Sequence, residues 1–412
     1  METLIERCAG LDVHKDVVVA CVRRPGPKGQ RDVELRQFGT TTPQLLELRD
    51  WLVEQGVTLV GMEATGVYWK PVYYVLEDAM ECWLLNARHM RNVPGRKTDM
   101  ADAAWIAQLV EHGMVRPSFV PPKPIRELRN LTRYRKAQIE ERTRELQRLD
   151  KILQDAGIKL SSVASELEGV SGRRMLDALV SGQVEPAALA ELAKGRLRSK
   201  RPELEAALTG RFGRHHALIV GEILAKLDYL DEIIGRLSQE VDQAISPFAP
   251  QVQLLDTIPG VDQRMAEALV AEIGVDMSRF GSSDRLASWA GLCPGQHESA
   301  GKSRGGKTRK GSKWLRSHLT QAAKAASRTK GTYLSAQYHR LRGRIGPAKA
   351  TIAVAHSILV AAFHILDRLQ PYADLGDDWF VRRQSPERHA RRLVNQLALL
   401  GYDVTLTERA AA

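Results

Sequence analysis

The sequence predicts an α/β domain with a mixed β-sheet, followed by long helices and a second, helical domain. Three observations predict this fold class. Short segments rich in β-branched residues alternate with amphipathic helical patterns in residues 1–120. Two later stretches, 126–154 and 216–245, keep apolar residues at helical spacing over about eight turns each. After residue 248 the patterns are helical again, so the chain combines α/β and all-α parts.

The elements of residues 1–120 follow the order β-β-β-α-β-α-β-α. The expected strands are 8–13, 17–22, 34–40, 57–65 and 81–87, and the expected helices are 42–55, 67–79 and 99–112. Three consecutive strands followed by alternating helices and strands favour a mixed sheet that is covered by helices.

The remaining residues divide at proline-rich points. The run PPKP at 121–124 marks the end of the α/β domain, and Pro247 and Pro250 end the second long helix. The domains we expect are 1–120 (α/β), 121–156 with 215–247 (coiled-coil helices), 157–214 (a helical insert to which we assign no chemistry), 248–375 (helical) and 376–412 (a tail). The strict 3/4 spacing in 216–245 predicts a coiled-coil seam, which packs on helix 126–154, on a second copy, or on both.

Residues 254–274 (LLDTIPGVDQRMAEALVAEIG) read as helix, glycine turn and helix. This pattern is typical of a helix-hairpin-helix, in which the turn at Gly260 would present backbone N–H groups to a DNA phosphate. The alternative is a plain helical hairpin in the core.

Positive charge is concentrated in one segment. Residues 299–350 hold fourteen Lys and Arg and no Asp or Glu, within a chain of net charge +11. The other residues hold 46 Lys and Arg against 49 Asp and Glu, so the whole positive excess lies in this segment. Interleaved apolar residues indicate a folded basic surface, and such a surface is suited to nucleic-acid phosphates. The candidate phosphate-binding residues are Lys302, Arg304, Lys307, Arg309, Lys310, Lys313 and Arg316.

Cysteine usage and hydropathy bear on the cellular compartment. The four cysteines are scattered without the spacing of metal ligands, which favours a reducing, cytoplasmic setting. No signal-peptide pattern is present at the N-terminus. The longest apolar stretch, 351–366, is short for a membrane span and contains His356 and His364, so we expect a buried helix and no membrane contact.

Four carboxylates are candidates for metal-dependent chemistry. Asp12 ends the first expected strand, Glu63 lies near the end of the fourth, and Asp99 and Asp102 are three residues apart on one helix face. Alone, each has an ordinary explanation as a turn residue, a strand-end charge or a helix cap. Together, at neighbouring strand ends, they would repel one another without cations. Mg²⁺ suits such a site, and two ions about 4 Å apart could hold the attacking and leaving oxygens of a phosphoryl transfer.

These motifs together resemble the DEDD-type insertion-sequence transposases, which are serine-dependent recombinases guided by a bridge RNA. The matching segments are GLDVHK (10–15), GMEATGVYW (61–69), GRKTDMADA (95–103), the IPGV…AEIG pair and AGLCPGQHESAGKSRGG (290–306). The resemblance covers roughly residues 8–120 and 250–370.

The resemblance implies a fold, a reaction and partners. The first domain would be RNase H-like, of the RuvC type, with its metal-binding tetrad on Asp12, Glu63, Asp99 and Asp102 and with Mg²⁺, or Mn²⁺ in its place. Ser299, in His-x-Ser-x-Gly-Lys, would attack a DNA phosphate to form a covalent phosphoserine, with nearby Ser303 as the alternative nucleophile. A structured guide RNA, double-stranded DNA of the element ends and target, and a homo-oligomer (dimer or tetramer) on the bacterial nucleoid would follow.

Three other functions remain as alternatives. A resolvase-like nuclease would use the same carboxylates without rejoining strands, and a serine–DNA adduct would distinguish the two. An ATP-dependent kinase of the actin-like fold also begins with a strand ending in G-x-D, but it does not explain the acid-free segment 299–350. An architectural DNA-binding protein leaves the four carboxylates unexplained.

Overall fold

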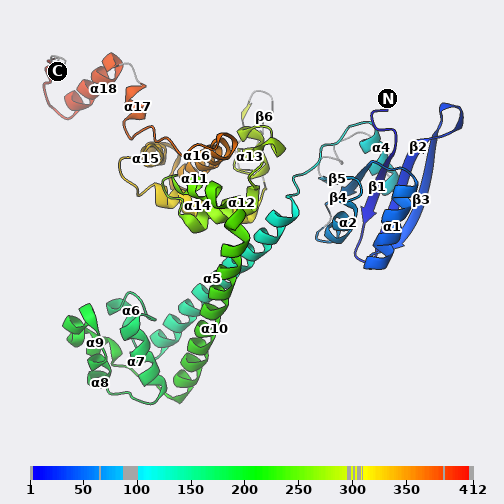
Figure 1. Cartoon of the computed structure of the whole chain (residues 1–412). Helices are drawn as coiled ribbons and strands as arrows, with labels where there is room; N and C mark the ends of the chain where they lie inside the picture. Colours follow the sequence, from blue (N-terminus) through cyan, green and yellow to red (C-terminus); the bar gives the residue numbers. More distant parts are fainter. Residues whose placement is uncertain are drawn as a thin grey trace. The chain divides into compact units, whose positions relative to one another are not determined.

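The protein folds into two compact units, residues 1–120 and 121–412, in this computed structural model (Figure 1). The structure describes residues 3–64, 66–86, 101–294, 298–299, 302–303, 308, 310–383 and 386–407. Each unit is described by itself.

The first unit is built on a five-stranded mixed sheet, which confirms the predicted fold class for this region. Its elements are β1 (Cys8–Val13), β2 (Val17–Pro25), β3 (Arg31–Gly39), α1 (Thr42–Glu54), β4 (Leu59–Glu63), α2 (Trp69–Leu76), β5 (Glu81–Leu85) and α4 (Ala101–Glu111). The strand order is β3-β2-β1-β4-β5. β1 is antiparallel to β2 and parallel to β4, so it is the central strand where the two kinds of pairing meet.

The hairpin of β2 and β3 is longer than the sequence patterns indicated. β2 continues to Pro25 and β3 begins at Arg31, three residues before the expected start of that strand. The added rungs are polar, with Arg24 Nε donating to Asp32 Oδ2 across the strands at 2.8 Å. Cross-strand ion pairs support an edge strand without an apolar alternation, which explains why the pattern was missed.

Helices cover both faces of this sheet. α1 and α2 bury the face that carries Leu11 and Met62 in one apolar cluster. α4 covers the other face and packs close to the strand backbones, because the nearest strand positions are Gly10 and Gly61. An ideal Cβ on Gly10 would lie 2.2 Å from the carbonyl oxygen of Ala103, so no side chain fits there.

The second unit begins with a long helical hairpin. α5 (Lys123–Asp155) and α10 (Arg214–Ile245) pack along each other within the chain (Figure 1). Buried residues on α10 include Val220, Leu227 and Val241. The intrachain packing expected of the 216–245 seam is therefore present, and pairing with a second copy stays a prediction.

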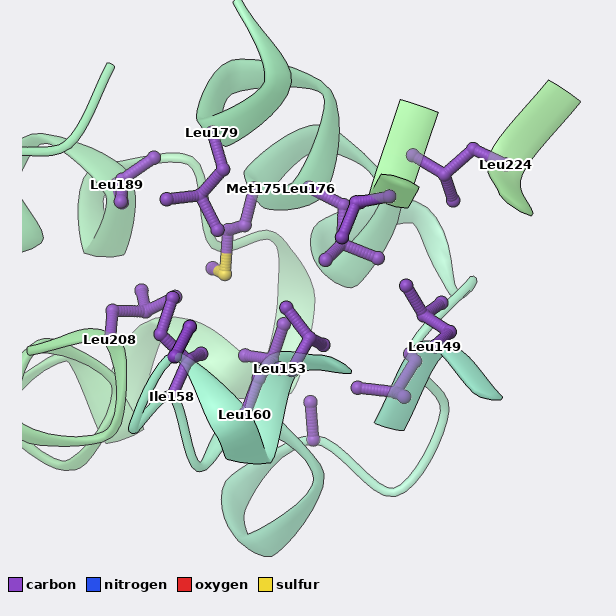
Figure 2. Packing of buried hydrophobic residues seen from close by; sticks show 14 of the residues in the cluster. Leu149, Leu153, Ile158, Leu160, Met175, Leu176, Leu179, Leu189, Leu208 and Leu224 are labelled. Atoms are coloured by element: carbon purple, nitrogen blue, oxygen red, sulfur yellow. The ribbon is translucent and has the colours of Figure 1, made fainter. Parts of the chain in front are cut away.

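The insert has a hydrophobic core of its own. Its elements are α6 (Leu160–Val163), α7 (Val170–Val180), α8 (Pro186–Glu191), η2 (Gly195–Lys200) and α9 (Arg201–Leu208). Side chains of these helices meet side chains from the adjoining ends of α5 and α10, such as Leu149, Leu153 and Leu224, in the cluster shown in Figure 2. The insert is thus a folded module at the far end of the hairpin.

The rest of the second unit is helical around one buried helix. The elements are η3 (Ser246–Phe248), α11 (Ala249–Asp256), α12 (Gln263–Ile273), η4 (Met277–Arg279), α13 (Ser283–Trp289), β6 (Glu298–Ser299), β7 (Lys302–Ser303), α14 (Lys313–Ala326), α15 (Tyr333–Ile345), α16 (Pro347–Arg368), α17 (Trp379–Arg382) and α18 (Pro386–Leu399). α16 packs against α11, α13, α14 and α15.

α16 is the buried helix that the apolar stretch 351–366 predicted. Among the described residues it is also the one helix whose length and composition would allow it to cross a membrane. Of its most apolar window, 56% is buried inside the protein, as in the core helix of a helical domain.

Candidate active site and nucleic-acid interface

Two of the candidate carboxylates lie on adjacent parallel strands at their carboxyl ends. Leu11 of β1 pairs with Met62 of β4, and Asp12 and Glu63 are the next residues on these strands. Side chains alternate between faces, so both carboxylates lie on the face opposite Leu11 and Met62, which is the face that α4 covers. Both are partly buried, with 17% of the Asp12 side chain exposed.

The close approach of α4 brings a third carboxylate to this face. Asp102 lies in the first turn of α4, directly before Ala103, whose carbonyl oxygen sits over Gly10. Gly10 is two residues before Asp12 and shares its face. The other end of α4 is fixed near the start of β1, where the Glu111 carbonyl accepts hydrogen bonds from the backbone of residues 4 and 5. The first turn of α4 therefore lies toward the carboxyl end of β1. The fourth candidate, Asp99, lies outside the described residues.

A histidine neighbour of Asp12 was not singled out as part of the site from the sequence. His14 Nε2 lies 3.1 Å from Asp12 Oδ2, while the His14 side chain is 57% exposed. The adjacency in GLDVHK was visible, but a polar residue after a strand is usually a surface residue. In the structure the imidazole touches the carboxylate and remains accessible to solvent.

The donor set at this face fits a hard divalent cation, because three carboxylates supply only oxygen ligands. One other cluster among the described residues has metal-ligand types, namely Asp155, His215 and His216. There, the backbone N–H of Gly213 donates to His216 Nδ1 at 3.0 Å, which leaves the proton of a neutral imidazole on Nε2, facing Asp155 Oδ2 at 3.1 Å. A protonated Nε2 cannot bind a metal, so we interpret His216 as a residue that caps the start of α10.

The candidate serine lies in a short hairpin. Ser299 in β6 pairs with Lys302 in β7, and Glu298 pairs with Ser303, so both candidate serines belong to the same two-stranded ladder. The side chains of these residues lie outside the described part of the structure, as do Arg304, Lys307 and Arg309 entirely. Their roles as nucleophile and phosphate ligands stay predictions.

The described basic candidates surround the start of α14. Lys310 and Lys313 are exposed, and Lys313 Nζ lies 5.3 Å from the ring centroid of Trp314. Arg316 is partly buried and donates from Nη1 to Thr308 Oγ1 at 2.8 Å, which ties the helix to the segment after the hairpin. Both lysines are exposed to solvent, whereas Arg316 is held by its hydrogen bond to Thr308.

The glycine turn between α11 and α12 packs against α14. An ideal Cβ on Gly260, whose φ is +84°, would lie 2.4 Å from Ala326 N and 2.5 Å from Ala322 O. The N–H of Val261 is used within the turn, donating to Ile258 O. These contacts explain the glycine by close packing and a left-handed backbone. A DNA contact at this turn stays a prediction.

Buried ion pairs connect the C-terminal helices to the long hairpin. Arg133 donates to both carboxylate oxygens of Glu272, at 2.7 and 2.9 Å, and Ser312 Oγ donates to the same carboxylate at 3.0 Å. Glu272 is 2% exposed. Ser312 is the N-cap of α14, so one buried carboxylate of α12 joins α5 to the helix that carries Lys313. Sequence reasoning missed this network, because Arg133 and Ser312 lie 139 and 40 residues from Glu272 along the chain.

Comparison with known proteins decides between the candidate functions. Residues 9–158 match the DEDD transposase family of IS110 type, and residues 252–339 match the IS116/IS110/IS902 transposase family. The two matches together cover more than half of the chain, in the order expected of one transposase. The chain belongs to the IS110-type DEDD transposases. No curated protein matches it.

Membership makes this transposase an enzyme of a mobile element that acts on DNA. The five-stranded mixed sheet is consistent with an RNase H-like DEDD domain, and DEDD-type domains use divalent metal ions. The kinase and architectural alternatives are thereby set aside. The matches leave residues 159–251 unassigned, which includes nearly all of the insert.

Proposed function

We propose that this transposase cuts and rejoins DNA through a covalent phosphoserine on Ser299, with metal ions held by Asp12, Glu63, Asp99 and Asp102. The observation that carries the proposal is the placement of Asp12 and Glu63 at adjacent parallel strand ends, on the face covered by α4, whose first turn carries Asp102. Carboxylates gathered on one face of a sheet favour a bound cation, because a cation offsets their mutual repulsion.

Mg²⁺ is the ion we propose, with Mn²⁺ able to replace it. Asp12, Glu63 and Asp102 supply oxygen ligands, and Asp99 is three residues from Asp102 on the same helical spacing. When bound, the ions would neutralise phosphate charge and acidify a hydroxyl that attacks phosphorus. His14 Nε2 would donate a hydrogen bond to the Asp12 carboxylate, 3.1 Å away, and so orient it.

The serine step conserves the energy of the phosphodiester. The Oγ of Ser299 loses its proton and attacks phosphorus, the bond between phosphorus and one sugar oxygen breaks, and that oxygen takes up a proton and leaves as a hydroxyl. In the second half, a sugar hydroxyl of the partner strand loses its proton and attacks the same phosphorus, the bond between phosphorus and Oγ breaks, and the serine oxygen takes up a proton. A free serine hydroxyl needs activation by a base or a metal. We assign that role to the metal, because residues 299–350 contain no Asp or Glu carboxylate that could accept the proton.

The remaining parts would hold the nucleic acids. We propose that 299–350 binds the DNA phosphates through Lys302, Arg304, Lys307, Arg309, Lys310, Lys313 and Arg316, with Gly260 in a helix-hairpin-helix contact. A structured RNA would select the DNA, and a dimer or tetramer in the cytoplasm, on nucleoid DNA, would bring two duplexes together.

The transposase is expressed from a plasmid that carries its gene and the native DNA on each side, and it is purified together with any RNA transcribed from the flanking DNA. The purified sample is then incubated with the plasmid DNA. Cleavage and recombinant junctions are measured with Mg²⁺, Mn²⁺ or EDTA. We expect Asp12→Asn and Asp102→Asn to lose both products, while Asp16→Asn, an exposed carboxylate near Asp12, keeps them. Ser299→Ala should behave like Asp12→Asn, and Ser303→Ala like the wild type.

Each other outcome contradicts a specific part of the proposal. Full recombination by Asp12→Asn would remove the carboxylate site. Cleavage without rejoined junctions in the wild type, unaffected by Ser299→Ala, would indicate a resolvase-like nuclease. Activity that persists in EDTA would exclude the metal.

A further inference from the structure

The insert is a folded module that lies almost entirely outside the two family matches. Met175 of α7 points into the core toward Leu208 of α9 and Leu153 of α5, and the neighbouring Leu176 belongs to the same buried cluster (Figure 2). All four are buried, with at most 2% exposure. A segment that only joined two long helices would not need such a core, because a short turn suffices for a helical hairpin.

A cavity of about 580 Å³ opens on the surface of this module. Three stretches line it, namely 163–166, 169–172 at the start of α7, and 194–197 with Lys200 in η2. The wall is held in place, because Ser171 Oγ accepts a hydrogen bond from the backbone N–H of Lys194 at 2.8 Å.

The rim of the cavity carries unpaired positive charge. Lys194, Arg196 and Lys200 are exposed, and none makes an ion pair with a carboxylate anywhere in the described part of the chain. One acidic residue, Glu166, also lines the cavity, so the cations outnumber it three to one. Arg201, just outside, differs because it pairs with Glu191 at 2.7 Å. The insert contains carboxylates such as Glu191, but they do not neutralise these three cations. The positive charge at the cavity would therefore attract a polyanion.

The remaining lining is largely apolar. Val163, Ala164, Val170 and Leu197 contribute nonpolar surface, and Val170 is 69% exposed at the start of α7. α7 begins there without a side-chain cap, so its first N–H groups add to the positive potential of the three cations. An apolar wall beside phosphate-binding cations matches one nucleotide, which has a base and a phosphate.

We propose that this cavity binds a nucleotide unit of single-stranded nucleic acid, with its phosphate on Lys194, Arg196 and Lys200 and its base against Val170. The insert is then a second nucleic-acid contact, separate from segment 299–350 and independent of the serine chemistry. RNA and DNA share the phosphate and the base, so both are tested as the source.

Binding to the full-length protein is measured by fluorescence anisotropy with a labelled oligouridylate, an oligothymidylate of the same length and a duplex DNA, at low and high salt. The test variant is Lys194→Gln with Arg196→Gln and Lys200→Gln. The matched control, Arg174→Gln with Arg211→Gln and Arg214→Gln, removes the same charge from exposed insert residues that do not line the cavity.

We expect the test variant to bind at least about tenfold more weakly to one single strand, with a salt slope lower by roughly 0.7, since the three cations hold one phosphate and each neutralised phosphate contributes about 0.7. The control variant should change less than about threefold. Val170→Glu should also weaken binding, whereas Val184→Glu, an exposed valine of the same module, should not. A larger effect on the oligouridylate assigns the site to RNA, and a larger effect on the oligothymidylate assigns it to DNA.

Photocrosslinking of the wild type gives a readout that does not depend on variants folding. With 4-thiouridine or its deoxy analogue in the probes, we expect adducts on peptides from 163–172 or 194–200. Equal weakening by both triple variants, no weakening by either, or crosslinks confined to other peptides would overturn the proposal. None of these results bears on DNA cleavage, so the failure of this inference is distinguishable from failure of the serine mechanism.

Discussion

Replacing Gly10 with alanine tests how the carboxylate face is built. The added Cβ would lie 2.2 Å from Ala103 O and 2.3 Å from Ala107 N, both backbone atoms of α4. Ordinary contacts to a Cβ are 3.4–4 Å and contacts under 3.0 Å essentially never occur, so α4 must withdraw by about 1 Å. Such overpacking costs about 1–3 kcal/mol, which corresponds to a fall in Tm of roughly 5–15 °C for a unit of this size.

The same shift would move Asp102 relative to Asp12. A displacement of about 1 Å at a reacting centre can lower a rate about a hundredfold. We therefore expect Gly10→Ala to reduce recombination by about two orders of magnitude at a temperature where circular dichroism shows it folded. Gly235→Ala is the control, because that exposed glycine of α10 has no neighbour within 4 Å and alanine favours a helix. A Gly10→Ala protein with wild-type Tm and activity would refute the packing of α4 on β1 described above.

Three further predictions concern the second unit. Glu272→Ala should lower the free energy of unfolding by about 3–5 kcal/mol, because it leaves Arg133 without its buried partner. Glu140 is exposed, so Glu140→Ala should lower it by less than about 1 kcal/mol. Equal effects of the two variants in denaturant unfolding would contradict the network. Burial, followed by the charge of Lys136, lowers the pKa of His318 to about 4, so stability should be full above about pH 6.5 and decline by roughly 2–3 kcal/mol as the pH falls toward 4. His318→Gln should flatten that part of the pH profile, and an unchanged profile would show that another group is responsible. Gly260→Ala should lower Tm by several degrees, since its Cβ would meet the α14 backbone at 2.4 Å; an unchanged Tm would mean that the turn does not pack there.

The sequence predicted the parts of the fold that depend on local patterns. Alternation of apolar residues located β1 and β2, helical spacing located α5 and α10, and their order implied a mixed sheet. The adjacency of Asp12 and Glu63 followed from the same reasoning, because parallel neighbours end at one edge of a sheet.

Features that depend on distant contacts could not be predicted. Gly10 has no local signature, since its role is to admit a helix that lies more than ninety residues later in the chain. The insert core combines residues from both long helices with short helices that lack a strong pattern, so the sequence predicted a helical insert at 157–214 but not its core. The IPGV motif predicted the glycine turn but not the packing of Gly260 against α14, because that contact depends on residues far away in the sequence.

The serine intermediate is the central claim, and peptide mass spectrometry tests it most directly. The transposase is incubated with its plasmid DNA and Mg²⁺, denatured, treated with nuclease and protease, and searched for peptides that carry a nucleotide. We predict a nucleotide on the peptide that contains Ser299 and Ser303, assigned by fragmentation to Ser299, present with Mg²⁺ and absent in EDTA and in Asp12→Asn. Cleaved DNA with no nucleotide-bearing peptide, or a nucleotide on a residue outside this hairpin, would contradict the account.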